Sequence, residues 1–192
     1  MITDASEEQT VLISIVIYGE STMKIWIVSV GEPLPTDGAN VRLRRMGNLA
    51  ALIAEKAENQ VDWFSVSFDH YKKKQRVQKD TVIPLKDNYR MHLAYVNGYK
   101  RNVSVARIIH HAVGGKKIYR QMCRQNKLPD VILASMEPLE MSSAAVQFGK
   151  RFHVPVIVDV RDLWPEIYYE VIPSKLHFLL NLYVGYCKGT LR

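Results

Sequence analysis

The stretch MKIWIVSVGEPLPTDGAN, residues 23–40, joins an apolar run to a loop rich in proline and glycine. Residues 25–30 are continuously β-prone and largely apolar, as in strands that are buried on both faces. The loop over 31–40 holds two prolines and two glycines, which interrupt regular structure. Apolar residues then recur at helical spacing over 41–55, with Asn40 as a candidate N-cap. This succession predicts the start of an α/β domain.

The same alternation of strand and helix continues along the chain. The remaining elements are predicted as strands over 61–68, 81–85, 131–134 and 154–160, and as helices over 104–125 and 142–152. Pro84 limits the second of these strands to a sheet edge, and Gly114 with Gly115 should weaken the long helix. The pattern predicts a Rossmann-like α/β fold, with a parallel sheet and helices on both faces.

One such domain is predicted over residues 23–172 of the 192-residue chain. Residues 1–22 are interpreted as an N-terminal extension or a mispredicted start, and an added edge strand is the alternative. The apolar run at 11–18 is too short to span a membrane. Residues 173–192 begin a strongly apolar helix without a closing strand, so a partner surface is expected for it.

Metal and dinucleotide chemistry are not predicted. Cys123 and Cys187 lie far apart, with no CxxC motif and no Cys/His cluster at ligand spacing. His110 and His111 are adjacent on a helix, face different directions and are interpreted as structural. His70 is interpreted as a solvated histidine rather than a general base. Neither G-x-G-x-x-G nor G-x-x-x-x-G-K-[ST] occurs. We therefore predict no metal and no cofactor.

The net charge of +7 is concentrated in two basic regions. Their members are Lys72, Lys73, Lys74, Arg76 and Lys79 in the first, and Lys100, Arg101, Arg107, Lys116, Lys117, Arg120 and Arg124 in the second. An anionic membrane, a phosphorylated small molecule or a nucleic acid would fit, and a solvated basic face is the simplest alternative. No nucleic-acid-binding motif is present, so no such partner is expected. The residues predicted to contact a membrane or another anion are Lys72, Lys73, Lys74, Arg76, Lys100 and Arg101.

Polar residues follow four of the predicted strands at their carboxyl ends, namely those at 25–30, 61–68, 131–134 and 154–160. They are Asp37, Gly38 and Asn40 after the first strand, Asp69 and His70 after the second, Ser135, Glu137 and Glu140 after the strand at 131–134, and Asp159, Arg161, Asp162 and Glu166 after the last. The carboxyl ends of parallel strands share one edge of the sheet, where α/β proteins bind ligands. We therefore predict one site at this edge.

Two of these motifs also have a purely structural interpretation. Asp37 and Gly38 could form only a turn, or Gly38 could let the backbone approach a phosphate. Asp159, Arg161 and Asp162 could neutralise one another and order the loop. Alternatively, Arg161 could bind a phosphate while the two carboxylates accept sugar hydroxyls. The residues alone leave both choices open.

With these motifs in place, the sequence resembles the N-terminal half of a family-4 glycosyltransferase of GT-B fold, close to the branch that builds bacterial surface polysaccharides. The matching segments are MKIWIVSVGEPLPTDGANVRLRR, FDH followed by KKK, YKRNVSVARIIHH, PDVILASMEPLE and VPVIVDVRDLWPEI. The resemblance spans residues 23–172. It implies that this domain binds the acceptor, and that a missing C-terminal domain, reached through 173–192, binds a nucleotide-sugar donor. It also implies metal-independent transfer with retention, at the cytoplasmic face of the inner membrane.

The resemblance further implies roles for the strand-end residues. Asp37, Gly38 and Asn40 would lie near the donor phosphate. The acceptor, a saccharide and often lipid-linked, would contact Ser135, Glu137, Glu140, Asp159, Arg161, Asp162 and Glu166. Many relatives have His-Glu-Pro where this chain has Met-Glu-Pro at 136–138, and no E-x7-E donor motif occurs. No catalytic residue is therefore named, and the chain alone is expected to be inactive. The alternative is a non-catalytic Rossmann-like module whose basic surface binds a membrane or an anionic polymer.

Overall fold

The computed structural model describes residues 22–102 and 104–160, together with 177, 178, 181, 184 and 185. Its elements are β1 (Lys24–Val28), α2 (Arg45–Ile53), β2 (Gln60–Val66), β3 (Phe68–Asp69), β4 (Lys74–Gln75), β5 (Thr81–Lys86), β6 (Tyr89–Ala94), α3 (Val105–Cys123), β7 (Val131–Ser135), α4 (Leu139–Phe152) and β8 (Val156–Asp159). The predictions for residues 1–22 and 173–192 fall almost entirely outside the described residues, and they stay predictions.

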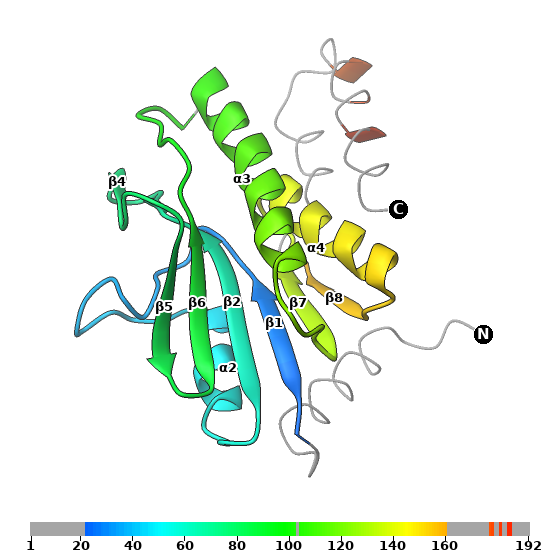
Figure 1. Cartoon of the computed structure of the whole chain (residues 1–192). Helices are drawn as coiled ribbons and strands as arrows, with labels where there is room; N and C mark the ends of the chain where they lie inside the picture. The colour runs from blue at the N-terminus through cyan, green and yellow to red at the C-terminus, as the bar shows by residue number, and fades with distance from the viewer. Residues whose placement is uncertain (1–21, 103, 161–176, 179–180, 182–183, 186–192) are drawn as a thin grey trace.

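The main sheet has six strands in the order β5-β6-β2-β1-β7-β8 (Figure 1). Every neighbouring pair is parallel except β5 with β6. The chain moves outward from β1 to β2 and β6, and it then returns to the other side of β1 for β7 and β8. This reversal places a topological switch point at the carboxyl ends of β1 and β7, where α/β folds form their ligand crevice.

Alternating side chains of the strands build a hydrophobic layer on each face of the sheet. On β1, Ile25 and Ile27 belong to the layer that includes α2. Trp26 and Val28 belong to the opposite layer, which includes α3 and α4. All four side chains are fully buried. Figure 1 shows α2 on one side of the sheet and α3 with α4 on the other. The predicted Rossmann-like α/β fold with helices on both faces is confirmed.

Strand β6 was not predicted, because its sequence YRMHLA carries two basic side chains. The structure explains both of them. The Asp62 carboxylate on β2 is fully buried and lies 2.8 Å from His92 Nε2 and 2.9 Å from Arg90 Nη2. Burial alone would raise the pKa of Asp62, but the hydrogen bonds from His92 and Arg90 outweigh it and hold the pKa below its ordinary value. The polar residues of β6 are therefore tolerated because they meet a partner on the adjacent strand.

The predicted start of one helix and the predicted weakness of another need correction. Helix α2 begins at Arg45 with Arg44 as its N-cap, so Asn40 is not the cap. In α3, the glycines mark close packing rather than weakness. A Cβ atom at Gly115 would lie 2.4 Å from the backbone oxygen of Glu140 on α4, and one at Gly114 would lie 2.4 Å from Met141 Cε. The pair therefore allows α3 and α4 to approach each other closely.

Candidate functional site

The loop after β1 is fastened to the segment after β2 by a buried ion-pair group, called here the arginine clamp: Asp37, Asp69 and Arg76. Arg76 Nε lies 2.6 Å from Asp37 Oδ1, and Arg76 Nη2 lies 2.7 Å from Asp37 Oδ2. Arg76 Nη2 also lies 3.4 Å from Asp69 Oδ2. The Arg76 side chain is only 12% exposed, and each carboxylate only 7%. Arg76 therefore serves this clamp and is not available on the exposed basic face predicted for it.

The clamp also lowers the pKa of Asp37. Its Oδ2 accepts a hydrogen bond of 2.8 Å from the backbone N–H of Leu34. Burial acts to raise the pKa of Asp37, but the hydrogen bonds from Arg76 and from the Leu34 backbone outweigh it and lower that pKa. The Asp37 carboxylate is thus ionised and occupied. Next to it, Gly38 (φ 151°) and Asn40 are exposed, and a Cβ atom at Gly38 would meet nothing within 4 Å.

Strands β3 and β4 form a short hairpin that carries Lys72, Lys73 and Lys74 of the first basic region. Asp69 Oδ1 accepts hydrogen bonds from the backbone N–H groups of Tyr71 (2.8 Å) and Lys72 (2.9 Å), which shapes the turn. Lys73 follows in the left-handed region, with φ at 52°. Its Nζ lies 2.6 Å from Asn102 Oδ1, in the loop before α3. The hairpin thereby joins two basic regions that are distant in sequence.

A cluster of rings lies between this hairpin and α3, called here the histidine–tyrosine cluster: His70, Tyr99, His110 and His111. The Tyr99 hydroxyl lies 2.6 Å from His70 Nδ1. The Tyr99 ring packs 5.2 Å from that of His110 and 6.3 Å from that of His111. His110 Nδ1 lies 2.8 Å from the Asn97 carbonyl oxygen. His70 is therefore part of a packed cluster and is not simply solvated, which corrects its predicted role.

All three histidines of the cluster have lowered pKa values. Burial is the largest cause for each of them, and nearby cations add to it. For His111, burial together with Arg107 and the other two histidines lowers the pKa to about 4. For His70, burial together with Lys73 and Arg107 lowers it. The cluster is consequently neutral at pH 7, in surroundings that already carry positive charge.

The predicted acceptor residues in and next to the loop after β7 differ in their exposure to solvent. Ser135 is buried at the end of β7, whereas Glu137 is exposed. Glu140 lies in the first turn of α4, where a carboxylate is favoured by the helix dipole. Its Oε2 is 3.8 Å from His111 Nδ1. Of these residues, Glu137 and Glu140 are the ones a ligand could reach.

Asp159 ends β8 and sits opposite Ser135 in the strand register. Its carboxylate pairs with Arg45 of α2, and its backbone oxygen accepts a hydrogen bond of 3.1 Å from Met136 N–H. The loops after β1, β7 and β8 therefore do approach one another at this edge. Arg161, Asp162 and Glu166 lie outside the described residues, so their predicted roles stay predictions.

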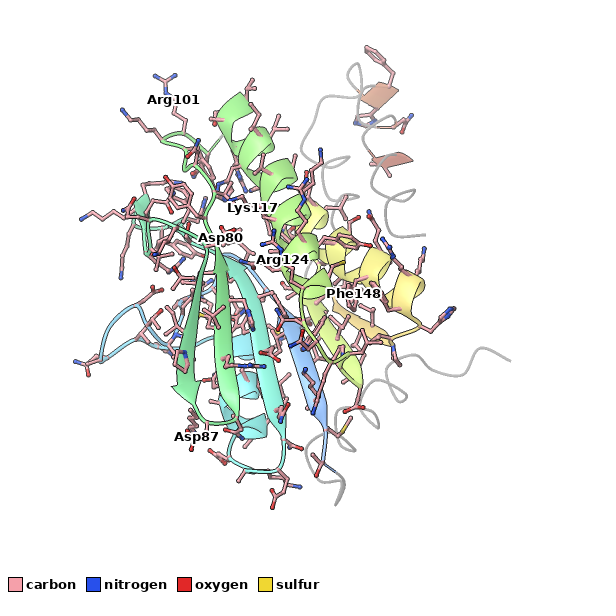
Figure 2. The ribbon with its side chains drawn as sticks, viewed as in Figure 1. Asp80, Asp87, Arg101, Lys117, Arg124 and Phe148 are labelled. Carbon is pink, nitrogen blue, oxygen red and sulfur yellow. The ribbon has the colours of Figure 1, made fainter. Side chains whose placement is uncertain are left out.

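Of the basic side chains predicted to contact anions, all except Arg76 are at least partly exposed. Lys72, Lys74, Lys100 and Arg101 are exposed, and Lys73 is half-buried. Arg76, as described above, is held in the clamp. Lys117 of the second basic region extends from α3 toward Asp80 (Figure 2), and its Nζ lies 3.2 Å from Asp80 Oδ1. The sequence did not reveal that residues 68–75 and 97–102 share one end of the sheet.

The described residues offer no set of three or more His, Cys, Asp or Glu side chains that could hold a metal ion. Over the same part of the chain, no helix is both long and apolar enough to cross a bilayer. Neither a comparison with protein-family models nor one with curated proteins gives a match. The structure itself defines the class, a doubly wound α/β protein of Rossmann-like type with a polar carboxyl edge.

Proposed function

We propose that this chain is the acceptor-binding domain of a retaining glycosyltransferase that uses a nucleotide-sugar donor. The observation that carries the proposal is the convergence of the loops after β1, β2, β7 and β8 at one edge of the sheet. Two side-chain ion pairs hold them there: Arg76 with Asp37, and Arg45 with Asp159. A fixed polar edge next to a switch point suits recognition of a saccharide.

In this proposal the edge has a donor side and an acceptor side. Gly38 and Asn40 are exposed on a loop that the clamp fixes, so the backbone there can approach a donor phosphate carried by a second domain. Glu137 and Glu140, at the start of α4, would accept hydrogen bonds from acceptor hydroxyls. Asp37 contributes by holding the loop, since its carboxylate is already paired with Arg76.

A transfer assay on the complete natural gene product tests the proposal. It would use radiolabelled nucleotide sugars and a lipid-diphosphate-linked saccharide acceptor. We expect transfer with retained anomeric configuration, and a loss of at least tenfold in kcat/KM for Glu137→Gln because a hydrogen bond to the acceptor is removed. Glu55→Gln, which neutralises an exposed glutamate just after α2, is the matched control.

The assay can also reject the proposal. Failure to transfer from any nucleotide sugar, by a folded product that contains no donor domain, would leave the non-catalytic binding module as the function. Normal transfer by Glu137→Gln would instead remove this residue from the acceptor site. Transfer with inverted configuration would overturn the retaining mechanism.

A further inference from the structure

A cavity of about 550 Å³, wide open to the surface, lies between the β3–β4 hairpin and the start of α3. Its lining includes three basic side chains and two aromatic rings: Lys73, Lys100, Arg101, Phe68 and Tyr99. None of the described residues that line it is acidic. Arg101 projects from the loop before α3, beyond the end of the sheet (Figure 2). The cavity therefore combines an apolar wall with positive charge that its own lining does not neutralise.

Lys73 is held at this cavity by contacts that leave its charge unbalanced. Its Nζ lies 2.6 Å from Asn102 Oδ1, 3.4 Å from His70 Nδ1 and 4.6 Å from the centre of the Tyr99 ring. Among the described residues, no carboxylate pairs with it. The left-handed backbone at Lys73 costs about 1 kcal/mol for a residue with a Cβ atom. Glycine or asparagine would avoid much of that cost. Lysine therefore occupies this position in spite of its backbone conformational energy.

The start of α3 adds a second source of positive potential. Ser104 is the N-cap, and Ser104 and Ala106 both line the cavity. The first turn of this 19-residue helix contains no acidic residue, so the positive end of its dipole is not neutralised from within. The cationic side chains at this end of α3 also act on His70, since Lys73 and Arg107 add to burial in lowering its pKa. Cations and helix dipole thus act together on one cavity.

We propose that this cavity binds the phosphate or diphosphate group of a phosphorylated ligand through Lys73, Lys100 and Arg101. A guanidinium and two ammonium groups match the multiple charge and several acceptor oxygens of such a group. The volume exceeds that of one phosphate, and the Phe68 and Tyr99 rings would contact the organic part of the ligand. The inference goes beyond the proposed function, because a non-catalytic module would use the cavity equally well. The ligand is either a soluble phosphate ester or a lipid phosphate at a membrane.

Calorimetric titration of the 192-residue chain with inorganic pyrophosphate is the direct test. We expect saturable binding with one site per chain, weakened by added salt. Lys73→Asn and Arg101→Gln should each reduce the affinity about tenfold, since each removes one charge-assisted contact. Lys73→Asn suits the left-handed backbone, so a folding defect does not confuse the result. Lys86→Gln is the matched control: it removes one positive charge from the end of β5 that pairs with the beginning of β6, at the opposite edge of the sheet.

Vesicle binding separates the two ligand sources. Vesicles of phosphatidylcholine with phosphatidic acid are compared with phosphatidylcholine and phosphatidylglycerol vesicles of equal surface charge. Preference for phosphatidic acid, lost in Lys73→Asn, indicates a lipid phosphate; pyrophosphate binding without vesicle binding indicates a soluble ester. The proposal is overturned if neither probe binds saturably, or if Lys86→Gln weakens binding as much as the cavity variants. If the chain binds phosphate but its complete gene product lacks transferase activity, the proposed function is rejected and the phosphate site is retained.

Discussion

The β3–β4 hairpin supplies a basic side chain to each of two adjacent regions that use charge in opposite ways. In the arginine clamp, Arg76 is buried between two carboxylates, and every charge has a partner. In the cavity three residues away along the chain, Lys73 is joined by Lys100 and Arg101, and no acidic residue of the described part of the chain lines it. Buried charge that is paired with an opposite charge orders a loop, whereas charge without a counter-charge at an open surface attracts a ligand. The difference separates the residues that build this edge from those that can bind there.

Removing the clamp arginine should have the largest effect on stability. We expect Arg76→Met to lower the free energy of unfolding by about 3 kcal/mol, because two buried carboxylates lose their partner. Urea unfolding followed by the fluorescence of the buried Trp26 and Trp63 measures this. Lys74→Met, which also replaces a cationic side chain by methionine but at an exposed site two residues before Arg76, should stay within about 0.5 kcal/mol of the parent. Equal losses in both variants would contradict the contrast between clamp and cavity.

The histidine–tyrosine cluster, between the hairpin and α3, predicts a pH effect. The pKa of His111 is about 4 in the folded chain and 6.5 in the unfolded one. Between these values only the unfolded state binds the proton, so stability falls as the pH falls from 6.5 to about 4. Arg107, His110 and His70 oppose protonation there, while Glu140 favours it. We expect a loss of about 2 kcal/mol across this window, reduced from the full shift because the side chain stays partly exposed.

A histidine variant provides the check on that effect. In His111→Gln, unfolding curves measured across the same pH window should show a clearly smaller loss, since the main titrating group is gone. His70 and His110 retain lowered pKa values and keep part of the dependence. An unchanged pH profile would show that His111 is not held neutral by its surroundings.

Packing without charge gives a smaller effect. Gly115→Ala places a Cβ atom 2.4 Å from a backbone oxygen of α4, which cannot move aside easily. We expect a loss of about 1–2 kcal/mol after allowing for the better helix propensity of alanine. Gly114→Ala meets the flexible end of Met141 instead, with Val66 Cγ1 at 3.2 Å, and should cost less than Gly115→Ala. Thermal unfolding of the two variants side by side measures the difference; the reverse order would contradict the close approach of α3 and α4.

The fold was largely predictable because its central strands are continuous apolar runs. β1, β2 and β7 needed no partner to be recognised, and Pro84 correctly indicated an edge strand. β6 was missed because His92 and Arg90 obscure its pattern, and their partner Asp62 becomes adjacent only when the sheet assembles. The local hydrophobic pattern of a sequence predicts which strands are buried, but it does not predict polar pairs between side chains on adjacent strands.

The same omission hid the cavity. Without β6 beside β2, nothing in the sequence placed the loop before α3 next to the hairpin after β2. Lys73 and Arg101 were therefore recognised as basic residues, but not as neighbours. Asp37 was predicted near a phosphate, yet it binds Arg76, 39 positions further along the chain. Strand-end position predicted which edge the residues share, while their pairing depended on contacts between distant segments.

The smallest expected change in stability is also the sharpest test of the contrast. Lys73→Asn removes a cation from the same hairpin as Arg76→Met, but it should alter the free energy of unfolding by less than about 0.5 kcal/mol. The lost contacts to Asn102 and Tyr99 are offset because asparagine tolerates the left-handed backbone at φ 52° better than lysine. Urea unfolding measures the stability, and pyrophosphate titration of the same sample measures the binding. A variant that lost about 2 kcal/mol of stability while keeping its affinity for pyrophosphate would make Lys73 a structural residue like Arg76, and the division between the two regions would fail.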